Sequence, residues 1–465
     1  MSTRRLVWRT ILALVAIALP LTLAIAHPED PKSGGLGPAM PGSGHVGEPL
    51  LPDRAGLILD FPAKNVALLS WLTPEDLSGE VQRANDIWGY VSPSGREYAI
   101  IGLERGTGFV DITDPVRPKV LKVARGPESI WRDIAVYREH AYAVNETGGG
   151  VQVFDLTAID DGKVKKLEPV QDLGLVTAHN ISVNEESGFA YLSGPNLAGG
   201  GLVALDLEDP ARPVVLEGTW PNHYVHDVLV VSYTKGRYKG REIAFAFAAE
   251  RGVEIIDVTD KANMVSLSNV PYPNLAYCHS GWLSKNRKFL YVNDELDERE
   301  TSEIASTQTY ILRVDDLDAG RYVSTFSTGE ESIDHNSMVD GRTLFAANYS
   351  SGLRVMSVKN PGRPKEIAYF DTHPEATSVG FDGAWGVYAT FPSKRVIVSD
   401  IQRGLFVLDP MRVKDMVALQ ARRAPRDPRP PTEPPTAAPE GPATPPGVGT
   451  LPAARDERPG RRIER

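Results

Sequence analysis

The chain has 465 residues, of which 42% are hydrophobic and 24% charged, and its 42 Gly and 37 Pro are too many turn formers for a mainly helical protein. A single cysteine excludes a disulfide-stapled scaffold and any cysteine-based zinc cluster. The formal net charge of -10 argues against a nucleic acid as the partner.

The N-terminal segment is predicted to be a signal peptide covering residues 1–26. Arg4, Arg5 and Arg9 precede an apolar run over 11–26, which ends in the small-x-small site Ala24-Ile25-Ala26. The protein is therefore expected to be exported and to be periplasmic, secreted or attached to the cell surface. Paired arginines at the start leave ordinary and twin-arginine export both open. No membrane span is expected once the signal is removed.

Composition sets the limits of the folded unit. Residues 27–56 are rich in Gly, Pro and Ser and are expected to be flexible. The propeller domain described next is expected over 57–417. Residues 418–465 form a Pro/Arg-rich stretch that cannot bury enough apolar surface to fold, so this tail is expected to be disordered.

A sevenfold repeat dominates the region between these ends. Short β-branched runs ending in an acid recur, as in 108–111, 151–155, 202–206, 253–257 and 405–409, with degenerate copies at 310–314 and 353–358. A second strand-like run precedes each copy, and a third run precedes that one. A spacing of 46 to 56 residues with about four strands per unit is typical of a β-propeller. The sequence thus predicts an all-β protein with seven blades.

The last copy lacks its outermost strand, whereas residues 65–72 read as an outermost strand without a copy of their own. We therefore expect the propeller to be closed by this N-terminal strand, which would pair into the last blade so that no sheet is left open.

The first residues of the innermost runs align into two columns. The first column consists of Asn85, Arg132, His179, His226, His279, His335 and Phe381. The second column consists of Asp86, Asp133, Asn180, Asp227, Ser280, Asn336 and Asp382. Since consecutive residues of a strand point in opposite directions, only one column is expected to face the central channel. Short polar side chains bond nearby backbone, so the second column is interpreted as structural.

These segments also resemble the bacterial choice-of-anchor B family of LVIVD-repeat proteins over roughly residues 65–410. The resemblance is carried by 85–90, 131–134, 178–181, 279–282, 293–298 and 334–336. It implies an exported or surface-attached propeller and implies no established activity.

The first column suggests a site, because its four histidines come from successive blades. His179, His226, His279 and His335 can together bind a divalent transition metal such as iron, copper, manganese or zinc. Nearby acids, Asp227, Glu250, Asp294 and Glu295, are candidates for orienting the imidazoles or binding a ligand, and Arg132 for holding an anionic group. A metal-free ligand or proton-transfer site and four separate structural histidines remain open alternatives.

Two other features of the sequence are weaker candidates for a functional site. The acidic stretch 294–303 lacks the spacing and the glycine of a calcium loop and is expected to be solvated. Cys278 is expected to act as a small buried hydrophobe.

The sequence leaves two functions open. The first is a binding module for a small molecule or a cell-envelope component, and the second is a metal-dependent enzyme with the four histidines as ligands.

Overall fold

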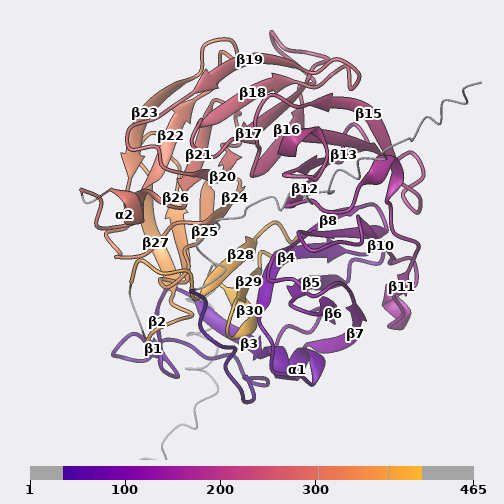
Figure 1. Cartoon of the computed structure of the whole chain (residues 1–465). Helices are drawn as coiled ribbons and strands as arrows, with labels where there is room; N and C mark the ends of the chain where they lie inside the picture. The colour runs from indigo at the N-terminus through magenta and orange to yellow at the C-terminus, as the bar shows by residue number, and fades with distance from the viewer. Residues whose placement is uncertain (1–34, 302, 376–377, 411–465) are drawn as a thin grey trace, which may run out of the picture. The chain divides into compact units, whose positions relative to one another are not determined.

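Seven antiparallel sheets surround a central hub in the computed structural model, which describes residues 35–301, 303–375 and 378–410 (Figure 1). Each sheet contributes one blade, so the chain is an all-β, seven-bladed propeller, as predicted. The only α-helices in these ranges are α1 (Pro74–Ser78) and α2 (Asp297–Glu300), and single 3-10 turns cover Ile159–Asp161, Asp172–Gly174 and Ala198–Gly200. The expected signal peptide at 1–26 and tail at 418–465 lie outside the described residues.

Each blade runs outward from the hub through strands in chain order. The innermost strands are β4 (Ala84–Val91), β8 (Arg132–Tyr137), β12 (Asn180–Asn184), β16 (Asp227–Ser232), β20 (Cys278–Leu283), β24 (Asn336–Asp340) and β28 (Ala384–Tyr388). The second strands are β5 (Glu97–Leu103), β9 (His140–Asn145), β13 (Phe189–Ser193), β17 (Glu242–Phe247), β21 (Phe289–Asp294), β25 (Thr343–Ala347) and β29 (Val396–Asp400).

The third strands carry the acid-ended repeat. They are β6 (Gly106–Asp111), β10 (Gln152–Asp155), β14 (Leu202–Asp206), β18 (Val253–Asp257), β22 (Thr309–Arg313), β26 (Leu353–Ser357) and β30 (Gly404–Asp409). The outermost strands are β7 (Lys119–Arg125), β11 (Lys165–Lys166), β15 (Val214–Trp220), β19 (Val265–Val270), β23 (Arg321–Phe326), β27 (Lys365–Phe370) and β3 (Ala67–Leu72).

Strand β3 closes the ring as predicted. It pairs antiparallel with β30, from Ala67 opposite Asp409 to Leu72 opposite Leu405. The N-terminal and C-terminal ends of the propeller thus share one sheet, and their indigo and yellow ribbons meet in Figure 1. The sixth blade is also extended, because β2 (Phe61–Lys64) pairs with β27 and β1 (Leu57–Ile58) pairs with β2. The repeat pattern did not predict this hairpin.

The stretch 35–56 differs from the expected flexible segment. Single β-bridges join His45 to Trp71 and Leu50 to Leu68, so the chain runs along the outer edge of β3. An outermost strand presents unpaired backbone groups, and these bridges satisfy some of them. The Gly37 backbone N–H also donates to Asp382 at 2.7 Å.

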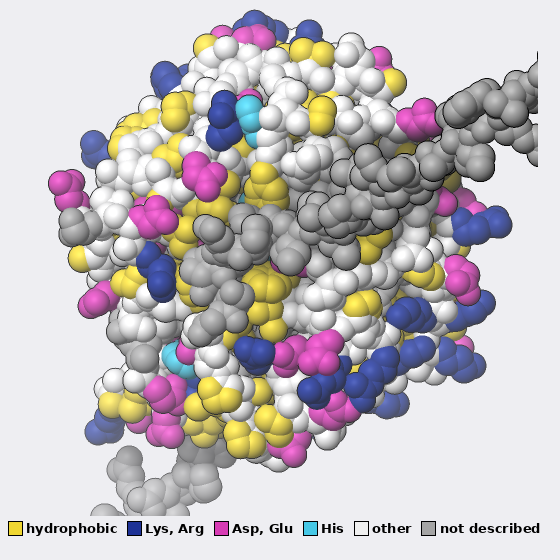
Figure 2. Space-filling model, viewed as in Figure 1, with side chains coloured by type: hydrophobic (Ala, Val, Ile, Leu, Met, Phe, Trp, Pro, Cys, Tyr) yellow, Lys and Arg dark blue, Asp and Glu magenta, His cyan; other side chains and the backbone are white. Residues whose placement is uncertain are grey.

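Packing explains the composition of the strands. The second strands β5 and β17 are buried at every residue, since neighbouring blades cover both of their faces. The outermost strand β7 has exposed residues at both ends, and basic side chains gather over β7 and β11 in Figure 2. Among the described residues, no helix combines the length and the apolar character needed to cross a bilayer.

The aspartate that ends five of the seven third strands has a local role. The Asp111, Asp155 and Asp257 carboxylates each accept the backbone N–H two residues later, at 2.9–3.0 Å. A carboxylate that bonds its own backbone in this way fixes a tight turn, which sends the chain toward the outermost strand.

Candidate metal and ligand site

A cavity of about 760 Å³ occupies the centre of the propeller, between the innermost strands. Side chains of the second column line it: Asp86, Asp133, Asn180, Asp227, Ser280 and Asn336. Some of these groups also bond backbone, as when the Ile181 N–H donates to Asp133 Oδ2 at 2.7 Å. The backbone bonds predicted for this column are confirmed, since Asn180, Asp227, Ser280 and Asn336 make them as well. The same column also faces the channel, which the structural interpretation did not predict.

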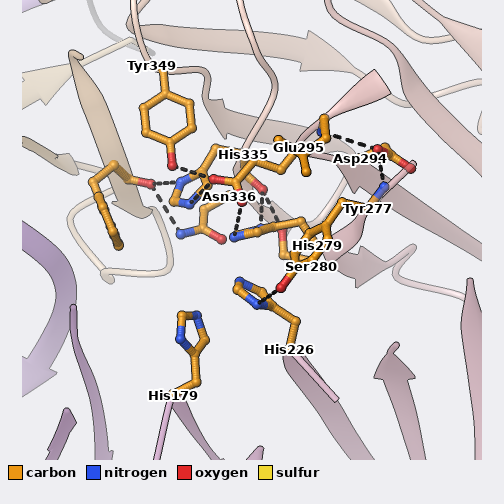
Figure 3. A network of polar contacts seen from close by, with 12 residues as sticks. His179, His226, Tyr277, His279, Ser280, Asp294, Glu295, His335, Asn336 and Tyr349 are labelled. Carbon is orange, nitrogen blue, oxygen red and sulfur yellow. Dashed lines mark hydrogen bonds and ion pairs between the residues drawn. The ribbon is translucent and has the colours of Figure 1, made fainter. Parts of the chain in front are cut away.

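The four column histidines lie in one row at the same end of the channel (Figure 3). Ring centroids are 3.9 Å apart for His179 and His226, 4.3 Å for His226 and His279, and 4.2 Å for His279 and His335. Their exposed fractions are only 7%, 1%, 3% and 1% in chain order. The rings thus come from neighbouring blades and are sealed from solvent on this face.

Hydrogen bonds fix which nitrogen carries the proton in three of these rings. His179 Nδ1 lies 2.5 Å from Glu146 Oε1, His279 Nδ1 lies 3.2 Å from the His335 carbonyl, and His335 Nδ1 lies 2.6 Å from the Trp385 carbonyl. Carbonyl and carboxylate oxygens only accept, so each Nδ1–H donates. In the neutral ring the Nε2 atom then presents its lone pair, as a metal ligand must.

His226 is held by a hydroxyl instead. Its Nδ1 lies 2.9 Å from the Tyr277 hydroxyl and 3.3 Å from the Tyr224 hydroxyl. Neither tyrosine was a candidate from the sequence.

Glu295 faces these rings from the loop between β21 and α2. Its Oε2 is 3.7 Å from His279 Nε2, and its Oε1 is 3.5 Å from His335 Nε2. The Tyr349 hydroxyl donates to the same Oε1 at 2.5 Å. Ligand atoms of His226, His279 and Glu295 all lie within 4.8 Å of one another. A buried carboxylate beside lone-pair nitrogens calls for a cation between them, either a proton or a metal ion.

A second, small cavity of about 20 Å³ borders this cluster. Its wall includes His179, His279 and His335. Space of this size accommodates a single water molecule or ion. Four residues line both cavities: Asp86, Asp133, Asn180 and Asn336.

The carboxyl groups of Asp86 and Asp133 on this shared wall, and of Asp227 in the large cavity, have perturbed acidities. Burial raises the pKa of Asp86 to about 6 and that of Asp227 to about 6. Burial, together with the neighbouring Asp86 charge, raises the pKa of Asp133 well above its ordinary range.

The predicted ligand-binding residues Arg132, Glu250 and Asp294 differ in their positions. Arg132 lines the small cavity beside the histidines. Its Nε and Nη2 donate to the carbonyls of Leu103 and Pro127, at 3.2 Å and 2.5 Å, whereas its buried Nη1 has no hydrogen-bond partner among the described residues. Burial lowers its pKa to about 10. Glu250 is exposed in the loop between β17 and β18.

Asp294, expected to orient an imidazole, holds its own loop. Its Oδ1 accepts the Tyr277 N–H at 2.7 Å, and its Oδ2 accepts the Tyr272 hydroxyl at 2.9 Å and the Ala276 N–H at 3.0 Å. Burial is the main reason that its pKa rises to about 7. These bonds position the following residue, Glu295.

The acidic stretch after β21 is not solvated over its first half. Asp297 is fully buried and Glu298 is 6% exposed, and both approach Asp334, which directly precedes His335. Nothing in the sequence distinguishes these acids from a solvated run, so they were missed. Cys278 is buried, as expected, and burial raises the pKa of its thiol.

Comparisons with known proteins add little to the site. No family model matches the chain, and no curated protein matches it. Solved structures similar to it include a protein from Lactobacillus plantarum, with 15% identity, a TM-score of 0.47 and coverage of 69% of this chain and 88% of that one. A periplasmic gluconolactonase from Pseudomonas aeruginosa has 14% identity and a TM-score of 0.46, covering 68% and 89%. A functionally unknown protein from Desulfotomaculum acetoxidans has 12% identity and a TM-score of 0.47, covering 73% and 98%. Such likeness concerns the path of the chain and not its chemistry.

Proposed function

We propose that the chain is an exported propeller that binds a divalent transition metal at its hub and a small ligand in its central cavity. The metal ligands in this proposal are His226, His279 and Glu295, with His335 beside them. The observation that carries it is the buried Glu295 carboxylate, which lies 3.5–3.7 Å from two Nε2 atoms whose rings donate through Nδ1.

The donor set selects the class of metal. Two or three imidazole nitrogens with one carboxylate suit zinc, iron, copper or manganese better than calcium or magnesium, which prefer oxygen ligands throughout. The Nδ1 partners support the same assignment, because a metal-binding imidazole ordinarily donates its other N–H to a carbonyl or carboxylate.

The ligand in this proposal approaches from the large cavity. Asp86, Asp133 and Asp227 stand at its metal end, and aromatic side chains including Trp88, Trp282 and Tyr388 line its wall. Arg132 does not line this large cavity, and the acidic and aromatic groups that do favour a neutral or cationic small molecule over an anionic one. The proposal also covers a cell-envelope component that presents a neutral or cationic group to this cavity.

Export and family membership belong to the proposal as well. The N-terminal Arg4, Arg5 and Arg9 with the apolar run that follows support a signal peptide and a periplasmic, secreted or cell-surface location. The repeat motifs support a relationship to choice-of-anchor B, LVIVD-type propellers.

A metal-dependent reaction is the second candidate. It is favoured by the wall that the two cavities share, since a molecule in the 760 Å³ cavity lies next to the histidine row. Lewis-acid activation of a substrate carbonyl or water is the chemistry that such a metal supplies.

Metal analysis of the mature chain, purified without a polyhistidine tag, tests the proposal. We expect close to one transition metal per chain in the wild type, and loss of that metal in the double variant His226→Ala/His279→Ala. His223→Ala is the matched control, since His223 lies three residues before His226 but outside the row. Metal-free protein from the native host, or equal metal in the double variant and the control, would overturn the proposal. Incubation of loaded protein with candidate ligands then separates binding from turnover.

A further inference from the structure

We propose a second cation site, selective for a hard divalent ion such as Ca²⁺, between Asp297, Glu298 and Asp334. Asp297 and Glu298 belong to α2 in the fifth blade, and Asp334 stands just before β24 in the sixth. One carboxylate oxygen from each lies within 4.8 Å of the other two. This inference does not depend on the transition metal proposed above.

In both Asp297 and Asp334, one carboxylate oxygen accepts a hydrogen bond and the other, called open here, does not. The Tyr310 hydroxyl donates to Asp297 Oδ2 at 2.6 Å, and the Asn293 amide donates to Asp334 Oδ2 at 2.6 Å. The other oxygen of each, Asp297 Oδ1 and Asp334 Oδ1, is buried and has no hydrogen-bond partner among the described residues. Neutral donors therefore orient each carboxylate while leaving one oxygen open, as they do for ligands of a metal.

Glu298 is the second observation. Its side chain is 6% exposed, and no N–H or hydroxyl group in the described part of the chain donates to Oε1 or Oε2. Its hydrogen-bonding neighbour is the Asp297 carboxyl group, with which it can share only a proton of its own. Leaving a buried pair of carboxyl groups without a counter-ion costs free energy, so these oxygens point to a missing positive charge.

The described residues do not supply that charge. None of the ion pairs among them includes Asp297, Glu298 or Asp334. Arg299 is the nearest basic residue in the chain, but its guanidinium donates to the Val379 carbonyl at 3.3 Å and lies over the Phe381 ring at 4.8 Å. Burial and the nearby Asp334 and Asp297 charges accordingly raise the pKa of Glu298 to about 12. Without a cation this carboxyl group keeps its proton.

The donor set selects the ion. All the open atoms are carboxylate oxygens, with no nitrogen or sulfur among them, which suits Ca²⁺, Mg²⁺ or Mn²⁺ rather than zinc or copper. Ca²⁺ fits best, since it binds at 2.3–2.6 Å in irregular geometry, whereas Mg²⁺ demands near-ideal octahedral geometry. The carboxylate oxygens supply part of the six to eight oxygen ligands that Ca²⁺ takes.

Binding of Ca²⁺ to the full mature chain tests the site. After treatment with EGTA, we expect the wild type to bind one Ca²⁺ by calorimetry, and its unfolding temperature to rise with added Ca²⁺. Tb³⁺ should show luminescence sensitised by Tyr310, whose hydroxyl contacts Asp297. In Glu298→Gln the Ca²⁺ affinity should fall at least tenfold, and the unfolding temperature should no longer respond.

Glu300→Gln is the matched control, since Glu300 lies in the same helix but is exposed. It should bind Ca²⁺ as the wild type does. Glu298→Gln replaces a carboxyl group that is neutral in the absence of a cation by a neutral amide of similar shape and is expected to fold, and Asp334→Asn provides an independent variant. An unfolding temperature of the wild type that does not respond to Ca²⁺, or equal affinity in Glu298→Gln and Glu300→Gln, would overturn the inference. Retention of the Ca²⁺ in His226→Ala/His279→Ala would show that the two sites are separate, and its loss there would contradict an independent calcium site.

Discussion

Replacing Asp86 by Asn should stabilise the propeller at neutral pH and leave its stability unchanged in acid. Asp86 lines both cavities, and burial raises its pKa from the ordinary 3.8 to about 6. Asparagine keeps a carbonyl oxygen for backbone donors but carries no charge. The change therefore removes the cost of ionising this group in the folded state, together with the effect of its charge on Asp133.

The sign follows from the direction of the pKa change. Below pH 3.8 the carboxyl group is protonated in the folded and unfolded chain, so the wild type carries no penalty. As the pH rises toward 6, the unfolded chain has lost the proton that the folded chain retains, and the wild type loses stability. The gain from Asp86→Asn should therefore appear between these values and stay constant above them.

The magnitude comes from the same two values. The difference between 3.8 and about 6 corresponds to roughly 3 kcal/mol at about 1.4 kcal/mol per pKa unit. Asp86 is partly exposed to the cavity, and water there should reduce the gain to about 1–2 kcal/mol.

Guanidinium unfolding in EDTA at about pH 3.5 and about pH 7.5 measures this gain. Asp316→Asn is the control, because the Tyr238 hydroxyl and Arg237 lower the pKa of the exposed Asp316, and the change should act in the opposite direction. A variant that is no more stable than the wild type at the higher pH, or that is equally stabilised at both, would refute the reasoning.

Two further predictions concern ring closure and the metal centre. Leu68→Ala in β3, where Leu68 is fully buried, should cost about 3 kcal/mol of unfolding free energy, whereas Val265→Ala in the outermost strand β19, where the side chain is 48% exposed, should cost less than about 0.5 kcal/mol. Equal losses in guanidinium titrations would contradict the closing role of β3. Tyr349→Phe removes the hydroxyl that donates to Glu295 Oε1 at 2.5 Å and should weaken transition-metal affinity about tenfold in a competition titration, with the fold intact by circular dichroism. Unchanged affinity would remove Glu295 from the proposed ligands.

The sequence was informative where the repeat could be aligned. Seven copies and a missing outermost strand led to the pairing of β3 with β30, because an open sheet edge is costly and only residues 65–72 were left to cover it. The hairpin of β1 and β2 escaped prediction, since strands of two and four residues outside the repeat have no second copy for comparison.

The candidate site was predicted in part for the same reason. The spacing placed the four histidines on neighbouring blades, and the structure puts their rings side by side. It could not show that the second column faces the channel, since the alternation of side chains along a strand indicates that one column faces it without saying which. Burial of Asp297 and Glu298 likewise depends on how α2 packs between two blades, which a run of charged residues does not reveal.

The seventh blade has a consequence for biogenesis. Its inner three strands are synthesised last, while its outer strand is made first, since Ala67 pairs with Asp409. The ring therefore cannot close until β30 has left the ribosome, and contacts this distant in sequence slow folding. Until β30 has been synthesised, β3 lacks this partner strand. A chaperone that binds β3 would protect the nascent protein during that time. Deletion of either β3 or β30 should leave the sheet of the seventh blade incomplete.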